Sequence, residues 1–307
     1  MPESFPVTAQ IPASTSNLGP GFDALGLAVS LYNFVGLRPV DGEDGTLQRA
    51  SSRLPARTLK MAEAAARLFG EAIDRPVPAV AFDIWGEVPM ARGLGSSATV
   101  RAGLLAGLNR LAGEPLDQEA LIGLSSRLDN APDNSAASIR GGFVVARADP
   151  RSGRYLWSER FTVGDHLSFV AVSPDILVHT TKARRVLPKR MPHKDATRSL
   201  NSLAALVAVF ASGHYERLEN VVTDFIHQPY REKLAPFTPE AIRAGREAGA
   251  YCGWLSGSGS TVMCVSKQER ARAVGDAMQS VFKVNGMGNR LFRLEADNAG
   301  LQVIDRR

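Results

Sequence analysis

The chain has 307 residues, of which 44% are hydrophobic and 22% charged, so it can bury a substantial core, and we expect a globular protein of two domains. Its 36 basic and 31 acidic residues give a net charge of +5 without a long basic run, so we expect no nucleic-acid partner. No apolar stretch reaches the ~20 residues of a membrane span, and no basic and apolar leader begins the chain. We therefore expect neither export nor a membrane anchor.

Cys252 and Cys264 are the two cysteines, and both stand in apolar, strand-like runs. We favour buried, reduced thiols over a disulfide, which predicts a cytoplasmic protein. The five histidines are dispersed, and none has the spacing of a transition-metal site such as His-Glu-x-x-His.

Apolar periodicity alternates between strand-like and helix-like segments without an internal repeat, and this alternation predicts an α+β fold. Residues 5–11 and 24–40 have the pattern of strands. The alanine-rich segment 57–69 predicts a helix, which Gly70 could close.

A further strand is predicted at residues 80–85, because Val80, Phe82 and Ile84 alternate on one face, and Pro89 ends it. The glycine-rich segment 91–97 follows. Apolar residues then recur at helical spacing, namely Val100, Leu104, Leu108 and Leu111. The glycines therefore lie where a loop enters a helix.

This position suits phosphate, because a helix N-terminus offers unpaired N–H groups and a partial positive charge, and glycines let an anion approach the backbone. The segment is neither a Walker A loop nor a Gly-x-Ser-x-Gly elbow. Taken alone, it would more often be a cap of a core helix, and two companion segments reverse that interpretation. We expect it to bind nucleotide phosphates through Ala91, Arg92, Gly93, Leu94, Gly95, Ser96 and Ser97.

The first companion, residues 12–26, is dense in turn formers and polar groups. The simpler alternative is an irregular loop in which Asn17 and Asp23 bond to their own backbone. The second companion, residues 249–261, is a glycine-rich turn between two apolar runs, which alone would be a hairpin turn with a nest of N–H groups for an anion.

With these three segments in this order, the sequence resembles the GHMP kinases, a superfamily named for galacto-, homoserine, mevalonate and phosphomevalonate kinases. The resemblance covers nearly the whole chain. It implies a nucleotide domain of ribosomal-protein-like βαβ type over residues 1–152 and a ferredoxin-like domain over residues 153–307, divided at the turn-rich segment 149–153. The matching motifs are Ser16-Asn-Leu-Gly-Pro-Gly-Phe-Asp23, Pro89-Met-Ala-Arg-Gly-Leu-Gly-Ser-Ser97 and Ser256-Gly-Ser-Gly-Ser-Thr261.

The form of the first motif is typical of the homoserine kinase branch. That resemblance implies a homodimer that uses ATP to phosphorylate the side-chain hydroxyl of L-homoserine to O-phospho-L-homoserine, in threonine biosynthesis. Two arginines in the implied site could clasp a carboxylate, and Asp23 or Asp133 could face the ammonium, although each arginine alone could be a solvated surface residue. The implied substrate residues are Asn17, Asp23, Asp133, Asn134, Thr180, Arg184, Arg231 and Gly257.

The chain departs from this branch at residues 128–134, where homoserine kinases usually read Glu-Gly-His-x-Asp-Asn. Asp129 stands in the place of the metal-binding glutamate, and Ala131 in the place of the histidine. We expect Ser97 and Asp129 to hold Mg²⁺ and Asp133 to orient the substrate, which makes these three the catalytic residues. Positioning and charge neutralisation would supply most of the acceleration of phosphoryl transfer.

These substitutions leave alternatives open. The chain could be a GHMP kinase for another small alcohol, such as a sugar or an isoprenoid precursor, or a catalytically impaired, nucleotide-binding regulatory homologue. An RNA-binding role lacks the basic and aromatic pattern that it would need. Asp129 and Asp133 could also be loop carboxylates that cap local N–H groups.

Overall fold

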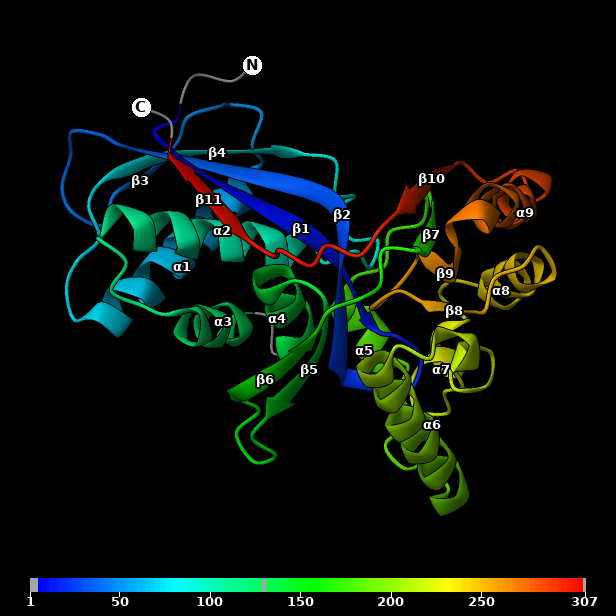
Figure 1. Cartoon of the computed structure of the whole chain (residues 1–307). Helices are drawn as coiled ribbons and strands as arrows, with labels where there is room; N and C mark the ends of the chain where they lie inside the picture. The colour runs from blue at the N-terminus through cyan, green and yellow to red at the C-terminus, as the bar shows by residue number, and fades with distance from the viewer. Residues whose placement is uncertain (1–4, 129–130, 306–307) are drawn as a thin grey trace.

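The computed structural model describes residues 5–128 and 131–305, which form two β-sheets with their covering helices (Figure 1). The larger sheet has seven strands, with β5 paired to β2 and β6 paired to β5 beside the main order β11-β1-β2-β4-β3. These strands are β1 (Val7–Asn17), β2 (Gly21–Pro39), β3 (Leu47–Arg49), β4 (Val80–Gly86), β5 (Phe143–Ala148), β6 (Tyr155–Phe161) and β11 (Gln302–Asp305).

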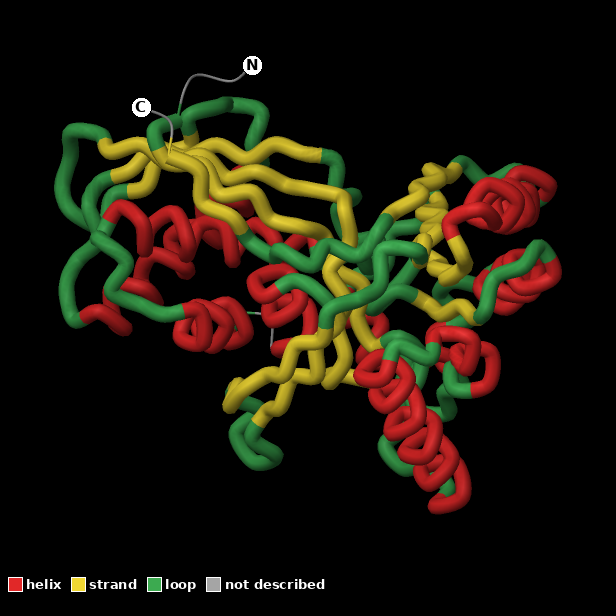
Figure 2. Tube along the Cα trace, in the orientation of Figure 1, coloured by secondary structure: helices red, strands yellow, loops and turns green. Residues whose placement is uncertain are grey.

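Helices from the first half of the chain cover one face of the large sheet (Figures 1 and 2). The closest packing is that of α2, because a Cβ on Gly107 would lie 2.2 Å from Leu37 of β2 and a Cβ on Gly103 would lie 2.5 Å from Val35. This contact fixes the helix, and thereby its N-terminus, against the sheet. The covering helices are α1 (Ala56–Ile73), α2 (Ser96–Leu111), α3 (Gln118–Arg127) and α4 (Pro132–Arg140).

The expected end of the first helix at Gly70 is wrong. Helix α1 continues to Ile73, and Asp74 closes it in the left-handed conformation at φ 51°, with its backbone N–H bonded to the carbonyl of Gly70. Glycine is tolerated within a helix at a modest cost, and an aspartate can adopt the left-handed region that the cap needs. The helix expected after the glycine-rich segment and the strand expected at 80–85 are confirmed.

The smaller sheet has the strand order β10-β7-β9-β8, and helices α8 and α9 pack against it. This βαββαβ arrangement is ferredoxin-like and confirms that prediction. Its elements are β7 (Leu167–Pro174), α5 (Thr180–Arg185), α6 (His193–Ser212), η1 (Tyr215–Asn220), α7 (Gln228–Arg231), α8 (Thr238–Glu247), β8 (Cys252–Leu255), β9 (Val262–Lys267), η2 (Gln268–Arg270), α9 (Ala271–Val284) and β10 (Asn289–Leu294).

The two sheets share a hydrophobic core, in which Phe143 of β5 stacks on Phe210 of α6 with 4.2 Å between ring centroids. Cys252 and Cys264 are buried and unbonded, as predicted, and burial raises the pKa of the Cys264 thiol to about 12. Within the described part of the chain, no helix combines the length and the apolar character needed to cross a bilayer.

The turn at residues 149–153 joins β5 to β6 inside the large sheet, and β11 pairs with β1 of the same sheet. The smaller sheet therefore begins at β7 and lies between two parts of the larger one in the sequence. The division of the chain at residues 152 and 153 stays a prediction about its domains.

Candidate active site

A cleft of about 690 Å³ is lined by residues from both halves of the chain. Most of the expected site residues border it, and they are Asn17, Asp23, Ala91, Gly93, Gly95, Ser96, Ser97, Asp133, Asn134, Thr180, Arg184, Arg231 and Gly257. Arg92 and Leu94 do not border it. Asp129 lies outside the described residues, and the neighbouring Ala131 borders the cleft.

The loop before α2 is held in a conformation that needs glycine. Gly93 and Gly95 have φ values of +80° and +67°, a region that other residues rarely adopt. A Cβ on Gly93 would lie 2.1 Å from the carbonyl oxygen of Ser256, and one on Gly95 would lie 2.2 Å from Oγ of Ser14. No side chain caps the start of α2, so its N-terminal N–H groups remain suited to an anion in the cleft.

Arg92 and Leu94 do not line the cleft and instead anchor the loop to the rest of the protein. Leu94 is 1% exposed in the core, and Arg92 Nη1 lies 3.0 Å from a carboxylate oxygen of Asp175. The backbone N–H groups of Thr261 and Val178 donate to the carbonyls of Arg92 and Ala91. These contacts bind the loop to the smaller sheet.

The first and third motifs meet beside the loop. Asn17 Nδ2 donates to the carbonyl of Gly257 at 3.0 Å, and Asn17 Oδ1 accepts from the N–H of Asp23 at 3.1 Å. The hydroxyl of Ser256 donates to the carbonyl of Gly93 at 2.6 Å. The Asn17 side chain thus bonds to the backbone six residues on, which is not the two-residue spacing of an Asx turn. It forms part of a junction of all three glycine-rich segments.

Asp133 and Asn134 lie in the first turn of α4. Asn134 Oδ1 accepts from Ser14 Oγ at 2.9 Å, and its Nδ2 donates to Ser16 Oγ at 3.0 Å. Asp133 is 2% exposed and accepts from the N–H of Asn134 at 2.7 Å. The α4 terminus is thereby fixed to the first motif, with the Asp133 carboxylate at the cleft.

Two arginines that border the cleft lie over the ring of Phe22. Arg184 makes a bidentate contact with Asp23, at 2.8 and 2.9 Å, and its guanidinium carbon lies 5.6 Å from the Phe22 ring centroid. Arg231 is 2% exposed, lies 5.1 Å from the same ring centroid, and donates to the carbonyl of Gly257 at 2.8 Å. Burial lowers the pKa of Arg231 to about 10, so the group remains cationic at neutral pH.

Several residues that line the cleft were not predicted from the sequence. Trp85 lies in the cleft beside Phe34, with 5.8 Å between ring centroids, and Arg57 Nη2 lies 3.4 Å from the Met90 sulfur. A large aromatic residue on the face of a strand opposite Val80, Phe82 and Ile84 is a signal that could have marked Trp85. His227 and Asp224, which contact this site from behind, carried no comparable signal.

Comparison with known proteins shows the family to which the chain belongs. The family profile for the GHMP kinases N terminal domain matches residues 58–142, and that for the GHMP kinases C terminal matches residues 203–284. A homoserine kinase from Clostridium beijerinckii is 32% identical, with 97% of this chain and 99% of the relative covered. One from Deinococcus radiodurans is 36% identical, with 97% of both chains covered. The chain belongs to the GHMP kinase family.

Solved structures show that this GHMP kinase also has the family's fold. The crystal structure of homoserine kinase from Cytophaga hutchinsonii superposes with a TM-score of 0.88 at 24% identity, over 99% of both chains. A mevalonate kinase crystal structure superposes with a TM-score of 0.69 at 14% identity, over 95% of this chain and 99% of the other. Together with the sequence matches, the fold makes this GHMP kinase an ATP-dependent small-molecule kinase.

Proposed function

We propose that this GHMP kinase transfers the γ-phosphoryl group of ATP to the side-chain hydroxyl of L-homoserine, forming O-phospho-L-homoserine for threonine biosynthesis. The observation that carries the proposal is the pair Arg184 and Arg231 over the ring of Phe22, with Asp23 of the first motif bonded to Arg184. A guanidinium binds a carboxylate through paired hydrogen bonds, and a carboxylate binds an ammonium. An amino-acid alcohol carries both groups.

The cleft also suits a nucleotide. The uncapped start of α2 offers N–H groups to a polyphosphate, and Met61, Trp85 and Met90 add apolar and aromatic surface to the same cleft. This arrangement can separate a charged phosphate end from an apolar base end. It supports ATP as the phosphoryl donor.

The donor atoms at the phosphate end suit Mg²⁺, which takes oxygen ligands and usually retains several waters. Ser97 and Asp133 bring a hydroxyl and a carboxylate to the cleft. We propose Ser97 and Asp129 as the protein ligands of the ion. When bound, Mg²⁺ would neutralise charge on the transferring phosphates.

The protein's own residues position the reactants. The carboxylate of Asp23 is held by two bonds from Arg184, and its backbone N–H is held by Asn17, so it can face the substrate ammonium without reorganisation. Asp133 is fixed by α4 and can orient the hydroxyl for in-line attack. Such positioning and charge neutralisation supply most of the acceleration in phosphoryl transfer, so the proposal needs no strong base.

An ADP-release assay with purified protein, ATP and Mg²⁺ tests this function across L-homoserine, L-serine, L-threonine, mevalonate and galactose. ADP release that depends on L-homoserine supports the proposal. Turnover of mevalonate or galactose would replace it with a kinase for another alcohol. If no compound caused ADP release while the protein still bound ATP, the result would favour a catalytically impaired regulatory homologue. The alanine at position 131, in place of the family's histidine, is the reason for that alternative.

The proposed metal role of Asp129 has its own test. Asp129→Ala should sharply reduce turnover and raise the Mg²⁺ concentration needed for half-maximal rate, whereas Asp41→Ala in an exposed loop serves as the matched control. Unchanged kinetics of Asp129→Ala at limiting Mg²⁺ would remove it from the metal site.

A cytosolic homodimer completes the proposal. Buried, reduced thiols suit the cytosol, and the homodimer is the usual assembly of the family that the chain resembles. Light scattering on the eluting protein measures the mass directly.

A further inference from the structure

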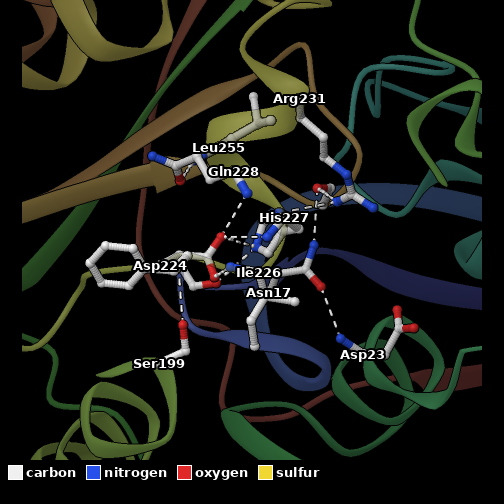
Figure 3. A network of polar contacts seen from close by, with 12 residues as sticks. Asn17, Asp23, Ser199, Asp224, Ile226, His227, Gln228, Arg231 and Leu255 are labelled. Atoms are coloured by element: carbon white, nitrogen blue, oxygen red, sulfur yellow. Dashed lines mark hydrogen bonds and ion pairs between the residues drawn. The ribbon is translucent and has the colours of Figure 1, made fainter. Parts of the chain in front are cut away.

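A buried polar network lies behind the cleft and is not explained by substrate binding alone (Figure 3). Its base is Asp224, whose side chain is 2% exposed and accepts from the backbone N–H groups of Ile226, His227 and Gln228 at 2.8, 2.9 and 2.6 Å. Ser199 Oγ supports the same segment by accepting from the N–H of Phe225 at 3.1 Å. These bonds fix the start of α7 and the place of His227, which is fully buried.

The contacts of His227 define its tautomer. Its Nε2 lies 2.8 Å from the carbonyl oxygen of Gly19, which can only accept, so Nε2 carries the hydrogen. The position of Asp224 Oδ2, 3.5 Å from the same nitrogen, agrees with this assignment. Nδ1 is then an unprotonated acceptor, and Arg231 Nη1 lies 3.3 Å from it. Burial lowers the pKa of His227 to about 4, which keeps the ring neutral at physiological pH.

Buried acceptors use three of the N–H groups of Arg231. Its Nε donates to the carbonyl of Ala183 at 3.3 Å, and its Nη1 donates both to the carbonyl of Gly257 at 2.8 Å and to His227. A guanidinium has five N–H groups in a fixed plane, so three are used and the two on Nη2 remain. Nη2 makes no hydrogen bond to the described residues, and Arg231 borders the cleft.

We propose that His227 is a positioning residue that orients Arg231 toward the substrate carboxylate. As an acceptor at Nδ1 it fixes the guanidinium plane, and as a donor at Nε2 it connects that arginine to the Gly19 turn of the first motif. The identity of the anion rests on the proposed function. The contact between His227 and Arg231 does not.

Two substitutions separate the nitrogens of His227. His227→Gln places an N–H near the position of Nε2 and removes the acceptor at Nδ1, whereas His227→Asn places its amide oxygen near Nδ1 and removes the donor to Gly19. Ser199→Ala is the matched control, because it removes a buried bond of the same segment without contacting Arg231. Each protein is assayed with L-homoserine and with 3-aminopropan-1-ol, which lacks the carboxylate, as a substrate or as a competitive inhibitor.

We expect His227→Gln to raise the KM of L-homoserine about tenfold, the effect of losing a hydrogen bond to a charged group, with kcat and the KM of ATP within about twofold. His227→Asn and Ser199→Ala should stay within about threefold. The constants for 3-aminopropan-1-ol should be the same in all four proteins. Equal effects on both compounds, or a wild-type KM in His227→Gln, would overturn the proposal.

The tautomer provides a readout that does not need L-homoserine. Nitrogen-15 NMR of histidine-labelled protein should show His227 protonated at Nε2 alone, with the Nδ1 resonance shifting in Arg231→Lys. Protonation at Nδ1 would exclude acceptance from Arg231 and overturn the proposal. Absence of L-homoserine turnover in the wild-type protein, with the expected tautomer, would instead contradict only the proposed function.

Discussion

Acid should destabilise this protein through His227, whose pKa is lowered in the folded state. Burial is the largest cause of the lowered pKa, and Arg231 lowers it further, while Asp224, the Gly19 carbonyl and Asp23 oppose the shift. The native pKa is about 4, against an ordinary value of 6.5. The unfolded chain therefore takes up a proton at this residue at a pH where the native protein does not.

The sign and size of the effect follow from that difference. Stability is fully present above pH ~6.5 and is lost as the pH falls toward 4, because only the unfolded state gains a proton in that range. At 1.36 kcal/mol for each pKa unit, the whole effect is about 3 kcal/mol, and about 2 kcal/mol of it should be lost between pH 7 and pH 5.

Urea unfolding at pH 7, 6 and 5 measures this loss in the wild-type protein and in His227→Asn. The free energy of unfolding of the wild type should fall by about 2 kcal/mol more than that of the variant, since other titrating groups are common to both. His193→Asn, at an exposed position, should follow the wild type. Parallel pH curves for wild type and His227→Asn would refute the assignment of this acid sensitivity to His227.

Two substitutions test the cleft directly. Gly93→Ala should lower kcat/KM about a hundredfold or more, because its Cβ would meet the Ser256 carbonyl at 2.1 Å and displace the loop, whereas Gly153→Ala, with a similar φ of +70° and no atom within 4 Å, should retain activity. Equal activities of the two variants would contradict the role of the close approach. Arg184→Lys removes the two-bond contact with Asp23 and should raise the KM of L-homoserine about tenfold in steady-state assays, with that of ATP nearly unchanged. A parallel rise in both KM values would instead indicate general damage to the cleft.

The parts of the fold that depend on local pattern could be predicted from the sequence. The strand at residues 80–85, the glycine-rich entry to α2 and a turn within residues 249–261 all follow from short-range rules of strands, helix termini and hairpins. The end of α1 could not be predicted, because the helix continues through Gly70 and is closed by Asp74. The same limit applies to the packing of Arg92 and Leu94, whose partners come from β7, β1, the turn before β9 and the core.

The contacts of the buried network could not be predicted from the sequence. Arg231 was expected to contact substrate, but its burial and the orientation of its guanidinium depend on His227 and on the carbonyl of Gly257. Gly19 and His227 are 208 positions apart in the chain. Such contacts arise only when the two halves of the fold meet, so neither periodicity nor a local motif could indicate them.

The pairing of β11 with β1 has a consequence for how the protein is made. Val7 lies opposite Asp305, so this edge of β1 stays open until residues 302–305 have been synthesised. An exposed strand edge can pair with another chain, and domains that fold during synthesis normally start from the N-terminus. The larger sheet is therefore completed only when residues 302–305 have been synthesised, and until then the edge of β1 can pair with other chains.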